Sequence, residues 1–245
     1  MYGILLGVAI AFIIVLLAVF IISVIDMNRF VVREYRVGST KIKAPVKAVF
    51  LTDLHNKKYG KNNEKLLNCI RELNPDMILC GGDMIVAAPR KKNDCAIGFI
   101  TKLAAEYPVY YALGNHEYRS DIYPEKYGNM YREFEEPVVK SGVTLLRNRS
   151  FYLDACNIMI SGLEIDRKFY KRFRKPFMKE DYVASEIGDC RKDVFQVLLA
   201  HNPDFFPEYA AYGADLTLSG HVHGGIVRLP LIGGWVFPEI QWRTL

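Results

Sequence analysis

Cysteine is scarce in this chain, and its distribution excludes a disulfide-stapled fold. The five cysteines lie far apart, at positions 69, 80, 95, 156 and 190, and no two form a Cys-x-x-Cys pair. An odd number of scattered cysteines is typical of reduced thiols rather than of a disulfide framework. The pattern favours a reducing compartment for the globular part of the chain.

Internal repeats and linkers rich in serine or proline are also absent, so we expect one globular domain. The chain has 245 residues, and roughly 200 remain after an apolar N-terminus, enough for one substantial core. The net charge of +5 arises within residues 166–180, which contain seven basic and two acidic side chains, so the rest is neutral. A general nucleic-acid binder spreads its basic charge more widely, so we expect no nucleic-acid partner.

Charge is missing altogether from residues 4–25, where Ser23 is the only hydroxyl side chain. A helix of that length spans about 33 Å, against a hydrocarbon core of about 30 Å. A cleaved signal peptide would need a basic segment before the run and an Ala-x-Ala-like site after it, and neither is present. We predict one transmembrane anchor over residues 1–28, with a buried helix of a soluble protein as the alternative.

Basic residues follow this apolar run, whereas only the α-amine is positive before it. They are Arg29, Arg33, Arg36, Lys41 and Lys43. The positive-inside rule then places the C-terminal domain in the cytoplasm. We expect a single-pass cell-membrane protein with a juxtamembrane basic segment at 29–44 and a catalytic domain at 45–245.

Histidine is scarce too, and all five histidines fall in four short loops. The loops read Thr-Asp-Leu-His-Asn at 52–56, Gly-Asn-His-Glu at 114–117, Ala-His-Asn-Pro-Asp at 200–204 and Ser-Gly-His-Val-His-Gly-Gly at 219–225, and Gly-Gly-Asp-Met at 81–84 adds a carboxylate. Imidazole, carboxylate and amide oxygen are ligands of divalent transition metals. A metal-dependent hydrolase is therefore the leading hypothesis.

Each loop comes directly after an apolar run that reads as a β-strand. Segments in which apolar residues recur at helical spacing lie between several of these strands, at 62–73, 94–106, 123–141 and 203–211. The alternation predicts an α/β fold, with sheets covered by helices. Loops beyond the carboxyl ends of strands converge on one crevice in such folds. We therefore expect the five loops to meet.

The spacing of the histidines suits metal binding. Asp53 and His55 are two residues apart, so on an extended strand end both would point to the same side. His221 and His223 have the same spacing, and after a tight turn each could serve one metal.

The remaining loop residues complete a two-metal site. Asp83 could bridge two cations, Asn115 offers an amide oxygen, and His201 adds an imidazole. Two metals about 3.5–4 Å apart would activate a shared water and clamp the oxygens of a displacement at phosphorus. A histidine side chain ordinarily titrates near neutrality, so His116 could protonate a leaving oxygen or stabilise developing charge.

Each of these residues has a plainer explanation when it is taken alone. Asp83 and Asn115 could be ordinary turn residues, and a single histidine is often only a hydrogen-bonded polar group. The joint occurrence of five such loops favours the shared site. Glu117 either orients a neighbour or is solvated, and the residues around Pro203 read as a helix start.

In order and spacing, these motifs resemble those of the calcineurin-like metallophosphoesterases from about residue 46 to 225. The motifs are Asp53-x-His55, Gly82-Asp83, Gly114-Asn115-His116-Glu117, His201 and Gly220-His221-x-His223. The resemblance implies a four-layer α/β-β/α sandwich of two mixed sheets with flanking helices. It also implies two divalent ions, most often Mn²⁺, with Fe or Zn²⁺ as alternatives.

The resemblance assigns a role to each of the loop residues. Asp53, His55 and His223 would hold one metal, and Asn115, His201 and His221 the other. Asp83 would bridge the two metals, and His116 would be the catalytic histidine.

Within that family, the membrane-anchored branch is the most similar, with Thr-Asp-Leu-His at 52–55 and Arg-Leu-Pro at 228–230. Its members are compared with UDP-2,3-diacylglucosamine pyrophosphohydrolases and general phosphodiesterases. The likeness implies hydrolysis of a phosphodiester or pyrophosphate bond by metal-activated hydroxide, on a substrate that could be lipid-linked. A catalytically inactive scaffold of the same fold is the alternative function, although scaffolds of this kind have lost ligands.

Two segments leave alternatives open. The basic segment 167–179 interleaves its cations with aromatic side chains, so it is either a solvated loop or a surface that docks on anionic lipid head groups. Relatives continue for several strands past the Gly-His-x-His turn, whereas residues 224–245 are all that follow here. We therefore expect an incomplete second sheet or a truncated sequence.

Overall fold

The computed structural model describes residues 2–171, 176–223, 227–229 and 233–236, and the chain divides into the units Met1–Val37 and Gly38–Leu245. In the first unit, helix α1 runs from Tyr2 to Met27. Its 26 residues correspond to about 39 Å of helix, and residues Tyr2–Asp26 are long and apolar enough to cross a membrane. A signal sequence would meet the same criterion of length and composition.

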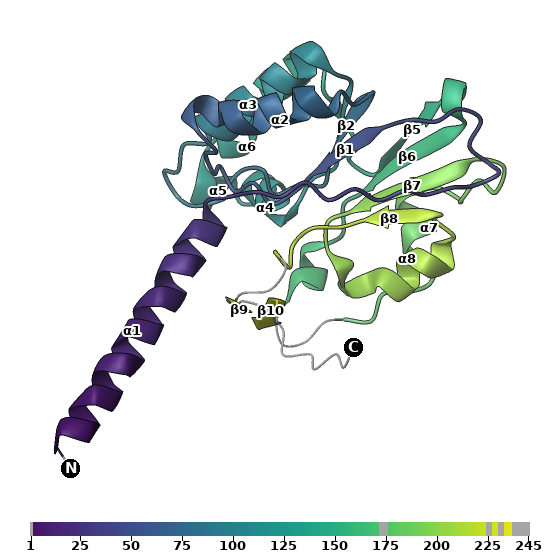
Figure 1. Ribbon diagram of the computed structural model, residues 1–245. Helices are drawn as coiled ribbons and strands as arrows, with labels where there is room; N and C mark the ends of the chain where they lie inside the picture. The colour runs from purple at the N-terminus through teal and green to yellow at the C-terminus, as the bar shows by residue number, and fades with distance from the viewer. Residues whose placement is uncertain (1, 172–175, 224–226, 230–232, 237–245) are drawn as a thin grey trace. The chain divides into compact units, whose positions relative to one another are not determined.

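The second unit alternates strands and helices along the chain (Figure 1). Its helices are α2 (Glu64–Leu73), α3 (Asp94–Glu106), α4 (Asn115–Ile122), α5 (Pro124–Tyr127), α6 (Met130–Lys140), α7 (Tyr182–Ile187) and α8 (Phe206–Tyr212). Its strands are β1 (Ala48–Leu51), β2 (Met77–Cys80), β3 (Val109–Tyr111), β4 (Thr144–Leu145), β5 (Arg149–Leu153), β6 (Ile158–Leu163), β7 (Phe195–Ala200), β8 (Leu216–Leu218), β9 (Val227–Leu229) and β10 (Gly233–Val236).

Two four-stranded sheets form the centre of the described part of this unit. The first has the order β1-β2-β3-β4, and all its neighbours are parallel. The second has the order β5-β6-β7-β8, in which β5 is antiparallel to β6 and the other pairs are parallel. Strands β9 and β10 form a separate antiparallel pair. The mixed character expected of both sheets is thus found only in the second.

Successive side chains of a strand point to opposite faces of its sheet, so the two faces contribute to separate cores. Ile78 and Cys80 of β2 pack with α2, α3 and α6, whereas Met77 and Leu79 pack between the two sheets. Leu198 of β7 points away from the space between the sheets, into a core with α7 and α8. Figure 1 shows these helices on the outer faces of the two sheets. The expected α/β fold of two sheets with flanking helices is confirmed.

The compact unit begins before the first strand. Lys41 forms an ion pair with Asp215, with Nζ and Oδ1 2.8 Å apart, and the Lys43 amide donates to the Cys156 carbonyl. Ile42 packs against the core between the sheets. Part of the basic segment expected at 29–44 therefore belongs to the globular unit.

The basic segment 167–179 is only partly within the described residues, because residues 172–175 lie outside them. Phe169 and Met178 are buried in the core with α7 and α8, whereas Phe177 is 82% exposed. Lys168 forms an ion pair with Asp166. The two buried side chains therefore anchor this segment to the protein.

Gly162 of β6 provides a test of the packing between the sheets. A Cβ atom at this position would lie 2.2 Å from the Leu146 carbonyl oxygen and 2.5 Å from the Leu146 Cβ. Such overpacking forces the backbone to move, so we expect Gly162→Ala to lower the free energy of unfolding by about 1–3 kcal/mol. Urea unfolding followed by circular dichroism would measure the loss.

Gly98 of α3 is the matched control, because a Cβ atom there has no neighbour within 4 Å. Alanine in a helix interior is more favourable than glycine by about 1 kcal/mol, so Gly98→Ala should stabilise the protein. Equal effects of the two substitutions would contradict this account of the packing.

Candidate metal centre

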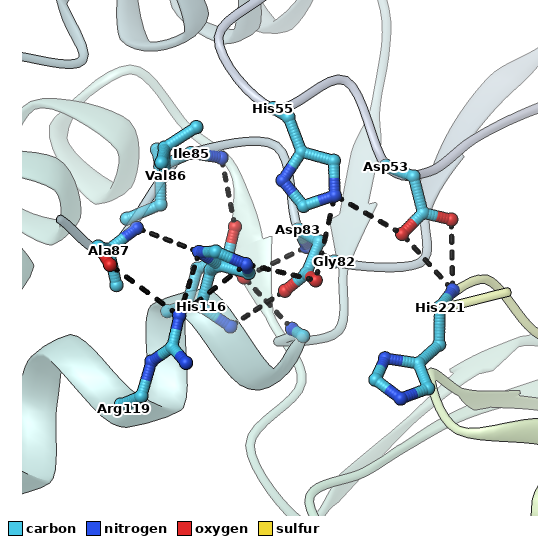
Figure 2. Close-up of polar contacts among 12 residues, drawn as sticks. Asp53, His55, Gly82, Asp83, Ile85, Val86, Ala87, His116, Arg119 and His221 are labelled. Carbon is cyan, nitrogen blue, oxygen red and sulfur yellow. Dashed lines mark hydrogen bonds and ion pairs between the residues drawn. The ribbon is translucent and has the colours of Figure 1, made fainter. Parts of the chain in front are cut away.

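The five ligand-bearing loops meet at one edge of the two sheets, as the sequence predicts. Figure 2 shows four of them, through Asp53 and His55, Asp83, His116 and His221. Each loop follows a different strand. Asp53 and His55 follow β1, Asp83 follows β2, Asn115 and His116 follow β3, His201 follows β7, and His221 and His223 follow β8. Both sheets therefore contribute, and residues far apart in the sequence share one site.

The backbone of these loops is unusual. Asp53, His55, Asp83, His221 and His223 all have positive φ, between 47° and 70°. This left-handed conformation is uncommon outside glycine and marks strained functional loops. The expectation that Asp53 and His55 lie on an extended strand end was wrong, because β1 ends at Leu51 and the chain then turns sharply. The two side chains still converge.

Glycine allows the loops to approach each other closely. Gly82 has φ +88°, and a Cβ atom there would lie 2.1 Å from the Gly114 nitrogen. At Gly220, a Cβ atom would lie 2.4 Å from the Asp53 carboxylate. The His221 amide donates to that carboxylate at 3.0 Å. Only backbone without a side chain fits between these loops.

The converging side chains form three overlapping groups whose candidate ligand atoms lie within 4.8 Å of one another. The groups are Asp53, His55 and His223; His55, Asp83 and His116; and Asp83, His201 and His221. The Nε2 atoms of His55 and His223 are 3.0 Å apart, and His223 Nε2 lies 3.4 Å from Asp53 Oδ1.

Asp83 lies at the centre of the site and is only 1% exposed. Its Oδ1 accepts a hydrogen bond from the His116 amide at 2.7 Å, at the start of α4. Its Oδ2 lies 3.1 Å from His201 Nε2, 3.8 Å from His55 Nε2 and 4.0 Å from His116 Nε2. One carboxylate oxygen therefore faces three imidazoles.

Two candidate ligand atoms of this site, His201 Nε2 and Asn115 Oδ1, are buried without a hydrogen-bond partner, as is Arg119 Nε. The other ring nitrogen of His201, Nδ1, lies 2.7 Å from the Gly81 carbonyl oxygen. Since a carbonyl only accepts, Nδ1 carries a proton, and Nε2, which lies 3.1 Å from Asp83 Oδ2, offers a lone pair when the ring is neutral. Buried polar atoms are almost always satisfied. Both atoms are metal-ligand types, so the residues present fit divalent cations.

Electrostatics keep most of these side chains ready to act as ligands. Burial lowers the pKa of His55, and burial together with His201 lowers that of His221 to about 4. Both imidazoles are therefore neutral at pH 7. Burial would raise the pKa of Asp83, but His201 and His116 hold it well below its usual range. His201 differs, since Asp83 and Asp53 outweigh its burial and raise its pKa to about 9.

His116 is held in one tautomer by its neighbours. Its Nδ1 accepts a hydrogen bond from the Ala87 amide at 2.8 Å, so the proton of the neutral ring is on Nε2. Burial and the nearby Arg119 lower the pKa of His116 to about 4, although Asp83 acts in the opposite direction. The ring therefore presents a neutral Nε2–H donor.

Glu117 is buried beneath two of the loops and holds them together. Its carboxylate accepts hydrogen bonds from the amides of Asp83 and Gly114, at 2.8 and 3.1 Å. The Met84 amide and the Tyr111 hydroxyl also donate to it, at 2.9 and 2.7 Å. Burial and the nearby Asp83 raise the pKa of Glu117 to about 7. Glu117 orients its neighbours, which resolves the choice that the sequence left open.

Sequence reasoning missed Tyr111 and Arg119 in this site. A glutamate at the third position of a helix is a capping signal, and it could have suggested the contact between Glu117 and the Gly114 amide. No comparable pattern indicated the other two residues, because their contacts depend on the tertiary structure.

Glutamine at position 117 should loosen the site. Its NH₂ group would face backbone amides that are themselves donors, so the two hydrogen bonds from the Asp83 and Gly114 amides would be lost. We expect Glu117→Gln to lower the free energy of unfolding by about 2 kcal/mol. Thermal unfolding would measure the change. Glu136→Gln is the control, because Glu136 is exposed and pairs with Arg132 at the surface. It should have little effect on stability. Equal losses of stability in the two variants would contradict the role of Glu117 in holding the loops together.

Comparison with known proteins gives a consistent result. The family model of calcineurin-like phosphoesterases matches residues 46–225. The chain is 30% identical over 203 residues to an uncharacterized metallophosphoesterase of Campylobacter jejuni, covering 79% of this chain and 48% of the relative. It is 28% identical over 192 residues to phosphodiesterase YaeI of Escherichia coli, covering 78% and 65%.

A third relative, the uncharacterized metallophosphoesterase YkuE of Bacillus subtilis, is 27% identical over 211 residues, which cover 81% of this chain and 68% of YkuE. The chain thus spans about half the length of the Campylobacter relative and about two thirds of the other two. Because the family model covers most of the chain and includes every loop of the site, the chain belongs to the calcineurin-like phosphoesterase family.

Proposed function

We propose that this chain is a phosphoesterase that uses two divalent metal ions to hydrolyse a phosphodiester or pyrophosphate bond. The observation that carries the proposal is a pair of buried candidate ligand atoms without a hydrogen-bond partner, Asn115 Oδ1 and His201 Nε2, of which the second lies 3.1 Å from Asp83 Oδ2. Asp53, His55 and His223 would hold one ion, and Asn115, His201 and His221 the other. Asp83 would lie between them. When bound, such ions lower the pKa of a shared water and neutralise charge at phosphorus.

The protein's own groups would position the substrate and handle the proton. The Nε2–H of His116 would donate a hydrogen bond to the leaving oxygen, where negative charge develops during the reaction. Ala87 keeps that donor in place by occupying Nδ1. The Gly81 carbonyl orients His201 in the same manner. Mn²⁺ is the metal we propose, with Fe or Zn²⁺ as alternatives, since carboxylate and amide oxygens suit Mn²⁺ and imidazole suits Fe and Zn²⁺.

The substrate we propose is a lipid-linked phosphoester or pyrophosphate, of which UDP-2,3-diacylglucosamine is an example. Helix α1 supports this proposal, because a membrane-spanning helix would hold the domain beside the bilayer. The name of the Escherichia coli relative, a phosphodiesterase, supports the reaction class. The basic residues after α1 support a cytoplasmic domain.

Replacing Asp83 and replacing His116 should each impair hydrolysis, but for different reasons. With the full chain in detergent and Mn²⁺, Asp83→Ala should lose bound metal and nearly all hydrolysis of bis-p-nitrophenyl phosphate. His116→Ala should keep the metal and lower kcat by about 10²–10⁴-fold. Metal content and initial rates would be measured together. Asp189→Ala, at an exposed carboxylate, is the control; activity that survives in the double variant Asp83→Ala/His116→Ala would refute the assignment.

Membrane association gives a separate prediction. We expect the full chain to sediment with membranes and to resist alkaline carbonate extraction, because α1 would be embedded in the hydrocarbon core. Protease added to intact cells should leave the domain uncut, and it should be cut after lysis. Immunoblotting would detect both outcomes. Digestion of the domain in intact cells would contradict the proposed orientation.

A further inference from the structure

Arg119 lies one turn after His116 on α4, and its guanidinium contacts the imidazole ring (Figure 2). Its Nη2 is 3.2 Å from His116 Nδ1 and 3.5 Å from His116 Nε2. The same nitrogen lies 3.5 Å from the Ala87 carbonyl oxygen. A cation therefore lies directly beside the donor that would face the substrate.

This cation has no counter-ion among the described residues. No carboxylate forms an ion pair with Arg119, and its buried Nε has no hydrogen-bond partner. Arg147, another half-buried arginine, pairs instead with both Asp121 and Glu164, at 2.9 and 3.1 Å. Arginine stays protonated, and a partly buried charge without a partner lowers stability. Its position next to the site points to an anion that arrives with the ligand.

The geometry places that anion on the His116 side of the site. An oxygen that accepts a hydrogen bond from His116 Nε2–H would lie about 2.9 Å from that nitrogen. Since Nη2 is 3.5 Å from Nε2, the same oxygen would lie at most about 6.4 Å from Nη2. Other oxygens of the same phosphoryl group, or of a second phosphate beyond the scissile bond, could reach it.

We propose that Arg119 binds an anion in this site. Its guanidinium contacts phosphoryl oxygens of the substrate on the His116 side. The inference rests on the proposed phosphoesterase function and extends it to the leaving side of the bond. A guanidinium presents several donors in one plane, which suits phosphoryl oxygens. Substrates with a second phosphate beyond the scissile bond would gain most from this contact.

Binding of inorganic phosphate tests the proposal without reference to turnover. We would load the full chain with Mn²⁺ in detergent and measure phosphate binding by calorimetry. Arg119→Met should weaken binding about tenfold or more, since it removes a charge-assisted contact. Arg119→Lys should recover part of the loss. Kinetics with bis-p-nitrophenyl phosphate should show a matching fall in kcat/KM for Arg119→Met.

Lys126→Met is the matched control, because Lys126 is an exposed cation near the same ring, Tyr127, that Arg119 approaches. Its phosphate affinity should equal that of the wild type. The inference is overturned if the phosphate affinity of Arg119→Met is within twofold of that of Lys126→Met. It is also overturned if Arg119→Met loses its metal or if the wild type binds no phosphate. Phosphate binding through Arg119 without any ester hydrolysis would uphold the inference and refute the proposed function.

Discussion

The carboxylates of Asp53 and Asp83 face a group of imidazole nitrogens in a largely buried site. Asp83 Oδ2 lies 3.1 Å from His201 Nε2 and 3.8 Å from His55 Nε2. Carboxylate oxygens and unprotonated ring nitrogens are both acceptors, so they repel each other unless a proton or a metal lies between them. Asp83 and Asp53 outweigh burial and raise the pKa of His201, and a proton on its Nε2 relieves part of this repulsion. The surrounding loops hold these acceptors together against that repulsion.

Holding the loops in this arrangement requires strain that other contacts offset. Among the described residues, twelve other than glycine have positive φ, and half of them lie in the site loops. Most of the others are asparagines, which tolerate this conformation well, whereas each strained aspartate or histidine costs about 1–3 kcal/mol. Glu117 counters the strain, since its buried carboxylate accepts from amides of two loops. A metal would add to this stabilisation by binding only the folded arrangement.

The sequence predicted the strands and the loop residues better than the elements around them. Apolar runs that end at Leu51 and Ala200 matched β1 and β7, and the range 94–106 matched α3. Helix α4 was missed, because its first residues read as a ligand loop and its later ones are polar. Strand β5 was missed because Arg149 and Ser150 interrupt its apolar pattern. Local patterns locate strand ends and their polar residues, but the partners of Glu117 and Arg119 are set by contacts between distant segments.

The polar groups of the site divide into two sides that suit opposite tasks. Carboxylates and imidazoles gather around Asp83, where their oxygen and nitrogen atoms could hold cations and, through them, a nucleophile. Donors gather around His116, whose Nε2–H adjoins the guanidinium of Arg119. Displacement at phosphorus needs such an asymmetry, because negative charge enters on one side and accumulates on the leaving oxygen at the other. The Ala87 amide maintains the division by donating to His116 Nδ1, since the other tautomer of the ring would present an Nε2 lone pair, an acceptor, to the leaving group.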